Sequence, residues 1–374
     1  MTSEGDRGMT RRRFLKFTAA GALAFTSVPT IIIPRRTEAY QAGGAVHPNV
    51  DPLRVVGVRD AAMTRPANPR TTWEQEEALV NWDPVQENMD RLAMGLAEEK
   101  GAADAWKKIL VKPADKSWGD VVVAVKTNQI ADQRTRSAVM SKLCHVLTDV
   151  LGVKGSNVYI YDACHGGNMS KNNPFKGLPE GVHIADQWGG YNMRVTVPAP
   201  YAKGQRQAKC LDHLVKDEVD ILVNVCLCKG HGSNFGGFTI SMKNHFGTFD
   251  PQPSHGDGGG ADYLIAINKS PQILGRMDPA NGNVLFPRQQ LCIVDALWAS
   301  NRGPQDLPDS QPNVLLMGTF GPVVDYVGAM RFRKDMMHWP VNEQVALRFL
   351  TEFGLSESSL PNGGKIIDVS PKVA

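Results

Sequence analysis

A short run of Val, Ile and Leu in the middle of the chain places the strictest limit on its fold. The run extends from Val219 to Val225, is interrupted only by Asp220 and Asn224, and ends in a polar loop rich in glycine. Because apolar residues occupy neighbouring positions rather than only alternate ones, the run predicts a strand buried on both faces. We therefore expect an α/β fold, with a mostly parallel sheet and helices on both faces.

Predicted strands and helices alternate along the rest of the chain. Apolar runs predict strands at 121–125, 157–161, 291–295 and 314–317, and helical spacing of apolar residues predicts helices at 83–99, 137–151, 261–268 and 341–349. Residues 166–205 are irregular apart from a strand expected at 193–197, and we interpret them as a covering insertion. Residues 40–80 show no sustained periodicity of apolar residues, and we expect them to form an extended arm. Residues 81–374 are therefore expected to form a single α/β domain.

The first 39 residues have the pattern of a twin-arginine signal peptide. Thr10-Arg11-Arg12-Arg13-Phe14-Leu15-Lys16 precedes a modestly apolar stretch at 17–33, and Thr37-Glu38-Ala39 offers a cleavage site. The stretch is too weakly apolar for a permanent membrane anchor. We expect the twin-arginine machinery to export the folded protein to the periplasm or another extracytoplasmic compartment, with no stable membrane span after cleavage.

Removal of the signal also removes the positive charge. Residues 1–39 hold seven of the 41 Lys and Arg residues and three of the 38 acids. Residues 40–374 therefore carry 34 basic and 35 acidic side chains, a formal charge of −1. This balance argues against nucleic acid as a partner.

Polar residues follow three of the predicted strands directly. They include Asn128 after the first, Asp162 and His165 after the second, and Lys229 and His231 after the central run. Ligands bind at the carboxyl ends of the strands in open α/β sheets, so we expect these residues to surround one site, joined by Lys243 and Asn244.

Each of these residue types suits a role in binding or proton transfer. Lys229 and Lys243 suit an anionic ligand, and burial would allow one of them to act as a base. With them, His231 and Asp162 are the candidate catalytic residues, whereas Asn244, His165 and Asn128 are the candidate substrate-binding residues. The alternative for the lysines is a solvated charge or a cap on loop carbonyls.

The thiols of the central loop suggest a metal. Cys226-x-Cys228-x-x-His231 places three ligand types within six residues, and Cys164 and His245, with His165 and His255, could complete a set. Thiolate and imidazole suit zinc, iron or copper. The alternative is that Cys226 and Cys228 are packed core residues or form a disulfide with Cys164.

Several motifs carry a resemblance to a known family. The segment 223–231 is similar to that family's strand leading into Lys-x-His, 242–247 to its Lys-Asn-x-x-Gly, and 293–296 and 321–325 to its Val-Asp-Ala and Asp-Pro-Val-x-x-Asp elements. Over about residues 121–355 the chain thus resembles the bacterial and archaeal domain-of-unknown-function family three-six-two. Some relatives add a ferredoxin-like iron–sulfur module, but this chain lacks its Cys-x-x-Cys runs. Gly321 stands where the family usually has Asp.

Two classes of function remain open. We expect a metal- or cofactor-dependent enzyme that acts on a small anionic substrate at the carboxyl edge of the sheet. The alternative is a non-catalytic periplasmic metal-binding or assembly protein. A serine hydrolase is disfavoured because no Gly-x-Ser-x-Gly follows a strand, and a nicotinamide dehydrogenase because no Gly-x-Gly-x-x-Gly follows the first strand.

Overall fold

A mixed eight-stranded sheet runs through the fold. The computed structural model describes residues 45–131, 133–163, 175–186, 188, 190–202, 206–256 and 259–372. The spatial order of the strands is β16 (Ile367–Asp368), β1 (Val55–Arg59), β15 (Val314–Gly318), β14 (Gln289–Ala296), β9 (Ile221–Leu227), β2 (Val123–Lys126), β5 (Val158–Tyr161) and β6 (His183–Ile184). Only β15 runs antiparallel to its neighbours, so the predicted mostly parallel α/β sheet is confirmed.

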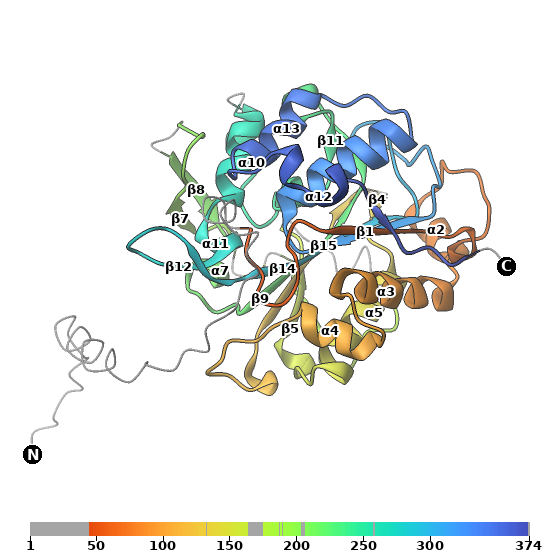
Figure 1. The fold of residues 1–374 in the computed structure, drawn as a ribbon, viewed down its shortest axis with the longest axis horizontal. Coiled ribbons are helices and arrows are strands. Elements are labelled where there is room, and N and C mark those ends of the chain that lie inside the picture. The colour runs from red at the N-terminus through yellow and green to blue at the C-terminus, as the bar shows by residue number, and fades with distance from the viewer. Residues whose placement is uncertain are drawn as a thin grey trace, which may run out of the picture. The chain divides into compact units, whose positions relative to one another are not determined.

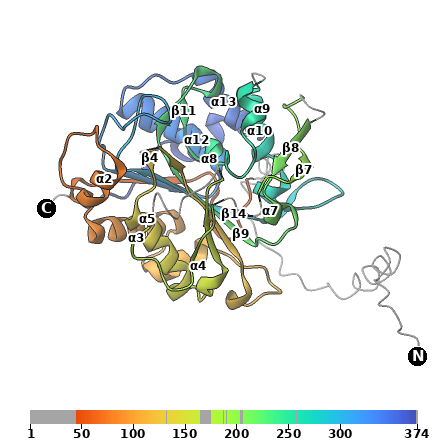
Figure 2. The same ribbon diagram turned by 180° about the vertical axis from the view of Figure 1, so that it is seen from behind.

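Helices cover both faces of this sheet (Figure 1). On one face lie α3 (Trp82–Ala97), α4 (Ala102–Ile109) and α5 (Ser137–His145), and on the other α8 (Ser241–Asn244), α10 (Gly260–Asn268), α12 (Gly321–Val327) and α13 (Glu343–Thr351). Figure 2 shows the same two layers from behind. Successive strand residues serve opposite layers: Val223 and Val225 of β9 pack with α3–α5, whereas Leu222 and Cys226 pack with the other layer.

Besides 3-10 and π-helical segments such as η9 (Gly328–Met336), the described chain also contains shorter α-helices and strand pairs. They are helices α2 (Trp73–Leu79), α7 (Asp212–Val215), α9 (Gln252–Gly256) and α11 (Pro271–Leu274), and the strand pairs β3 (Gln129–Ile130) with β4 (Gln133–Arg134), β7 (Met193–Thr196) with β8 (Gln207–Cys210), β10 (Lys229–Gly230) with β11 (Phe238–Thr239), and β12 (Gly275–Met277) with β13 (Val284–Pro287). Within the described part of the chain, every helix is too short or too polar to traverse a lipid bilayer.

The structure differs from the arm expected at residues 40–80, which contains helix α2 as well as a strand of the main sheet. Residues 55–59, expected in an arm, form β1, which lies between β15 and β16. Its run Val55-Val56-Gly57-Val58 is a buried strand too short to stand out from the irregular sequence around it. Helix α3, expected at 83–99, begins one residue earlier, at Trp82 after the N-cap Asn81, and ends at Ala97.

Candidate functional site

The ends of three parallel strands meet at one edge of the sheet. After β2, Lys126 Nζ lies 3.2 Å from Asp162 Oδ1 at the end of β5, and the amide of Gln129 donates to Asp162 Oδ2 at 2.8 Å. Asn128 Oδ1 in the same segment accepts a hydrogen bond of 2.7 Å from Lys229 Nζ, just beyond β9. Asp162 and Lys229 thus lie against one connecting segment. Cys164 and His165 fall outside the described residues.

A chain of amide side chains extends from this edge into the core. Asn128 Nδ2 donates to Asn244 Oδ1 at 3.0 Å, and Asn244 Nδ2 donates to Asn224 Oδ1 at 2.7 Å. Asn224 Nδ2 in turn donates to the carbonyl of Ser241 at 2.8 Å. All three asparagines are at most 3% exposed. Asn224, the polar interruption of the central run, therefore holds α8 against the sheet.

His245 belongs to the same buried layer. Its Nε2 lies 2.6 Å from Gln289 Oε1 and its Nδ1 lies 3.1 Å from the hydroxyl of Thr248. Burial lowers the pKa of His245 to about 3, so the imidazole is neutral at ordinary pH. Both of its ring nitrogens have partners in the protein, which makes it a hydrogen-bonded core histidine.

The position of α8 is fixed from the other side by Asp325. Its Oδ1 accepts hydrogen bonds from the backbone amides of Ser241, at 2.7 Å, and Met242, at 3.1 Å. Burial raises the pKa of Asp325 to about 7, although these hydrogen bonds oppose the rise. The motif that contains Asp325 thus serves to place Lys243 and Asn244, which follow on α8.

Asp295, near the end of β14, belongs to a second buried polar cluster, which lies on the opposite face of the sheet. Its Oδ2 accepts a 2.9 Å hydrogen bond from the amide of Arg136, whose guanidinium pairs with Glu76. Burial raises the pKa of Glu76 to about 8 and also raises that of Asp295. This cluster is buried beneath α2 and α5 and does not line the cavity described next.

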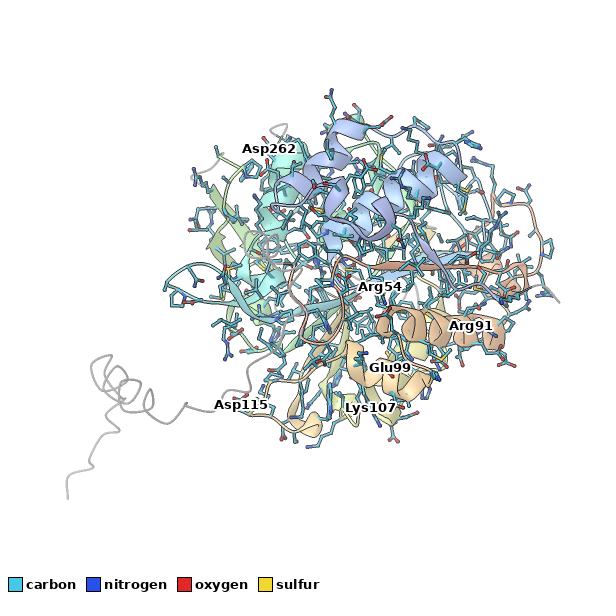
Figure 3. The ribbon with its side chains drawn as sticks, viewed as in Figure 1. Arg54, Arg91, Glu99, Lys107, Asp115 and Asp262 are labelled. Atoms are coloured by element: carbon cyan, nitrogen blue, oxygen red, sulfur yellow. The ribbon has the colours of Figure 1, made fainter. Side chains whose placement is uncertain are left out.

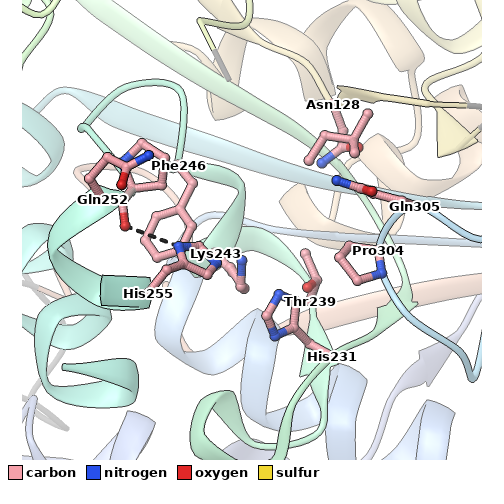
Figure 4. Close-up of a pocket in the computed structure, with 11 residues that line it drawn as sticks. Asn128, His231, Thr239, Lys243, Phe246, Gln252, His255, Pro304 and Gln305 are labelled. Carbon is pink, nitrogen blue, oxygen red and sulfur yellow. Dashed lines mark hydrogen bonds between the residues drawn. The ribbon is translucent and has the colours of Figure 1, made fainter. Parts of the chain in front are cut away.

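A cavity of about 270 Å³ opens beside α8 at the carboxyl edge. Figure 4 shows Lys243, Thr239 and His231 close together at its centre. The described lining consists of Asn128, Ile130, His231, Thr239, Lys243, Phe246, Pro251, Gln252, His255, Pro304 and Gln305. None of these described lining residues is acidic. Of the predicted site residues, Asn128, His231 and Lys243 therefore line the cavity, whereas Asp162, Lys229 and Asn244 lie behind its wall.

Lys243 brings a positive charge to the cavity wall. Lys243 Nζ lies 4.1 Å from the ring centre of Phe246 and 4.8 Å from that of Phe235, and aromatic faces attract a cation while limiting its contact with water. Burial, with the charge of Lys243 next in importance, lowers the pKa of His231 to about 3. The site therefore presents a lysine ammonium beside a neutral imidazole.

Among the described residues, the three buried lysines, Lys126, Lys229 and Lys243, all lie at this edge. Lys107 and Asp115 are exposed at the periphery (Figure 3), as is usual for charged residues. By contrast, Lys126 and Lys229 are fully buried. Lys229 Nζ also donates to the carbonyl of Pro304 at 3.1 Å, so it joins a lining residue to Asn128.

Gly230 allows the Lys-Gly-His segment to pass a neighbouring loop. A Cβ atom at Gly230 would lie 2.1 Å from the carbonyl oxygen of Arg302 and 2.2 Å from that of Asn301. The loop is itself fixed, because Arg333 Nη1 donates to the carbonyl of Ser300 at 2.9 Å. Only glycine therefore fits between Lys229 and His231 in this arrangement.

The two thiols proposed as metal ligands point into the core. Cys226 and Cys228 are fully buried and free, the Cys226 thiol donates to the carbonyl of Ile293 at 3.4 Å, and Arg333 Nη1 lies 3.8 Å from Cys228 Sγ. Burial raises the pKa of both thiols. The described residues contain no group of three or more His, Cys, Asp or Glu able to hold a metal. Because Cys164 lies outside them, the metal site stays a prediction.

Sequence reasoning missed much of the cavity wall. Thr239 on β11, Gln252 on α9 and the loop residues Pro304 and Gln305 come from segments that carry no motif. They reach the site because β11 pairs with β10, which places Thr239 opposite Lys229. His255 was considered only as a metal ligand and lies in the wall near His231, with ring centres 6.1 Å apart.

Comparison with known proteins identifies one family. A family model described as a domain of unknown function, DUF362, matches residues 123–330, which is more than half of the chain. This range contains β2, β9, α8 and β14, and hence most of the cavity wall. No curated protein and no solved structure matches the chain.

Proposed function

We propose that this chain, which belongs to the domain-of-unknown-function family DUF362, is an exported enzyme that binds a small organic anion in the cavity beside α8. The observation that carries the proposal is that Lys243 and His231 line the same cavity at the carboxyl edge of the sheet. A lysine ammonium in a partly desolvated site attracts an anion strongly because water screens the charge little there.

The proposed chemical role belongs to His231. Its neutral imidazole can accept a proton, although burial and, after it, the charge of Lys243 lower its pKa to about 3. A bound anion beside Lys243 would offset that charge and raise the pKa of His231 toward the range useful for proton transfer. His231 would then act as a general base or acid only when substrate is present.

The remaining predicted site residues have positioning roles in this proposal. Lys229 holds Asn128 and Pro304 in the wall. Asp162 fixes the 126–129 segment through Lys126 and the amide of Gln129. Asn244 joins that segment to α8, which carries Lys243.

Anion binding is tested by thermal unfolding at constant ionic strength with acetate, phosphate or sulfate replacing chloride. We expect at least one anion to raise the Tm of the wild type and to have no such effect on Lys243→Met. The matched control is Lys142→Met on α5, where the lysine pairs with Asp90 on the other side of the sheet; it should respond like the wild type. Equal responses in all three proteins would refute the site.

Catalysis is tested separately from binding. The protein is incubated with a mixture of small metabolites, and the NMR signals of the anions are followed with time. We expect wild type to consume an anion and His231→Gln to bind it without consuming it. If both proteins bind the anion and neither changes it, the non-catalytic binding role is correct instead.

Export and metal content complete the proposal. The twin arginines Arg11 and Arg12 lie outside the described residues, and replacing both with Lys should retain the protein in the cytoplasm in a cell fractionation. The metal prediction is tested by elemental analysis of untagged protein. Stoichiometric zinc, iron or copper that is lost in Cys226→Ser with Cys228→Ser would confirm it, and a metal-free wild type would reject it.

A further inference from the structure

Two polar atoms of the cavity wall lack a hydrogen-bond partner among the residues that the structure describes. They are the hydroxyl oxygen of Thr239 and Nδ1 of His231. Both residues line the cavity, and Thr239 is only 4% exposed. Buried polar atoms are almost always hydrogen-bonded to protein, water or ligand, because leaving one unsatisfied is unfavourable. The two atoms therefore indicate a polar group that binds inside the cavity.

The hairpin of β10 and β11 brings the two side chains to one face. Thr239 lies opposite Lys229, and the amide of His231 donates to the carbonyl of Gly237 at 3.1 Å, which continues the pairing. His231 is two residues from Lys229, so alternation directs His231 and Thr239 to the same side of the hairpin. Such diagonal neighbours lie about 7–8 Å apart, and Figure 4 shows both near Lys243. One ligand atom between them can contact both.

A hydroxyl group satisfies both atoms in either tautomer of the imidazole. Burial, followed by the charge of Lys243, lowers the pKa of His231 to about 3, so at ordinary pH one ring nitrogen donates and the other accepts. If Nδ1 is the acceptor, a ligand hydroxyl donates to it and accepts a hydrogen bond from Thr239. If Nδ1 is the donor, the same hydroxyl accepts from it and donates to the Thr239 oxygen. A carbonyl or carboxylate oxygen only accepts, so it fits the second tautomer alone.

The cavity has room for more than one water molecule. Its volume is about 270 Å³, whereas a water occupies about 30 Å³ in the liquid. Ile130, Phe246 and Pro304 add apolar surface to the wall around the polar atoms. These surfaces favour the carbon skeleton of a small organic molecule over a cluster of waters.

From this arrangement we infer that the substrate carries a hydroxyl group, which binds between Thr239 and His231. The inference rests on the proposed anion site at Lys243 and narrows its substrates to small hydroxylated anions. Thr239 determines this specificity, because an anion without a hydroxyl leaves the buried oxygen of Thr239 and Nδ1 of His231 unsatisfied. The bound hydroxyl also lies beside the imidazole to which the proposed function assigns proton transfer.

Two matched pairs of anions that differ in one hydroxyl group test the inference. They are propanoate with racemic lactate, and ethyl phosphate with 2-hydroxyethyl phosphate, so that carboxylate and phosphate head groups are both represented. Each anion is titrated into the full-length protein at pH 7 and constant ionic strength, and its affinity is taken from the rise of the Tm with concentration. We expect the hydroxylated member of at least one pair to bind about tenfold more tightly than the other member, which corresponds to about 1.4 kcal/mol.

Substitutions then locate the bound hydroxyl. Thr239→Val and His231→Phe remove the polar atoms with little change in side-chain size, and each should abolish the preference while the affinity for propanoate or ethyl phosphate stays that of wild type. Thr239→Ser retains the hydroxyl and should retain the preference. The matched control is Thr319→Val, since Thr319 is also 4% exposed with an unpartnered hydroxyl but does not line the cavity. This control should behave like the wild type.

The possible outcomes separate this inference from the anion site itself. Equal binding within both pairs that Lys243→Met abolishes would overturn the hydroxyl site and leave the anion site standing. A preference that survives Thr239→Val or His231→Phe would place the hydroxyl elsewhere and overturn the inference in the same way. If Lys243→Met leaves all binding unchanged, or if no member of either pair binds, both proposals are wrong.

Discussion

Gly230→Ala is the substitution whose effect follows most directly from the structure. The new methyl carbon would lie 2.1 Å from the carbonyl oxygen of Arg302 and 2.2 Å from that of Asn301. Non-bonded carbon and oxygen atoms do not approach so closely, so one of the two segments must move by about 1 Å. Both contacts are with backbone, so no side chain can turn away to relieve the clash.

The neighbouring loop resists that movement. The amide of Ser300 donates to the carbonyl of Cys228 at 3.2 Å, and Arg333 holds the carbonyl of Ser300. The amide of Asn301 donates to Asp309 Oδ1 at 3.0 Å. Overpacking costs about 1–3 kcal/mol, and each hydrogen bond lost adds about 1 kcal/mol. We expect Gly230→Ala to lower the free energy of unfolding by roughly 2–4 kcal/mol.

Urea unfolding at 25 °C, followed by tryptophan fluorescence, measures this free energy. Gly303→Ala is the matched control, because a Cβ atom there meets only the side chain of Asp306, at an ordinary 3.5 Å. The control should lie within about 0.5 kcal/mol of wild type. Gly230→Ala should also weaken anion binding, since Lys229 and His231 flank it. If Gly230→Ala is as stable as the control, the close approach of the two loops is wrong.

Three further predictions concern the polar core and the thiols. Asn244→Leu leaves buried groups of Asn128 and Asn224 without partners and should lower the free energy of unfolding by about 2–4 kcal/mol; an unchanged urea midpoint would contradict this. The folded state raises the pKa of Asp325 from 3.8 to about 7, so its stabilising protonation is complete below about pH 4 and lost as the pH rises through 7. As the pH rises from 4 to 8, the free energy of unfolding of Asp325→Asn should therefore increase relative to that of wild type, by up to about 4 kcal/mol. Urea unfolding at both pH values measures this, and a difference between the two proteins that does not change with pH would refute the raised pKa. The five cysteines of the described residues are buried and free, so they should react with Ellman's reagent only after unfolding, and fast reaction of more than one thiol in the native protein would contradict their burial.

The polar residues that follow predicted strands were the most reliable indication of where the site lies. Lys229, Asn128 and Asp162 each follow a buried strand, and parallel pairing brings such ends to one edge whatever the strand order. The order itself and the reversed direction of β15 could not be predicted, because they depend on long-range pairing that leaves no local pattern.

The chemical roles of individual residues were harder to predict. The motif places Cys226 and Cys228 near His231, yet alternation along a strand buried on both faces directs them into the core above the sheet. Asn244 looked like a ligand-binding amide and instead connects two asparagines. Whether a polar residue meets ligand or backbone depends on which segment packs over it, and the sequence does not contain that information locally.

The pairing of β1 bears on how the protein is made. Its residues 55–59 are among the first of the described chain to leave the ribosome, yet their strand pairs with β15 and β16, which follow much later in the chain. That side of the sheet closes only after residues 60–313 and then β15 have been released. Export of the unfolded chain during translation would separate these strands before they pair. Export of the folded protein would allow them to pair first.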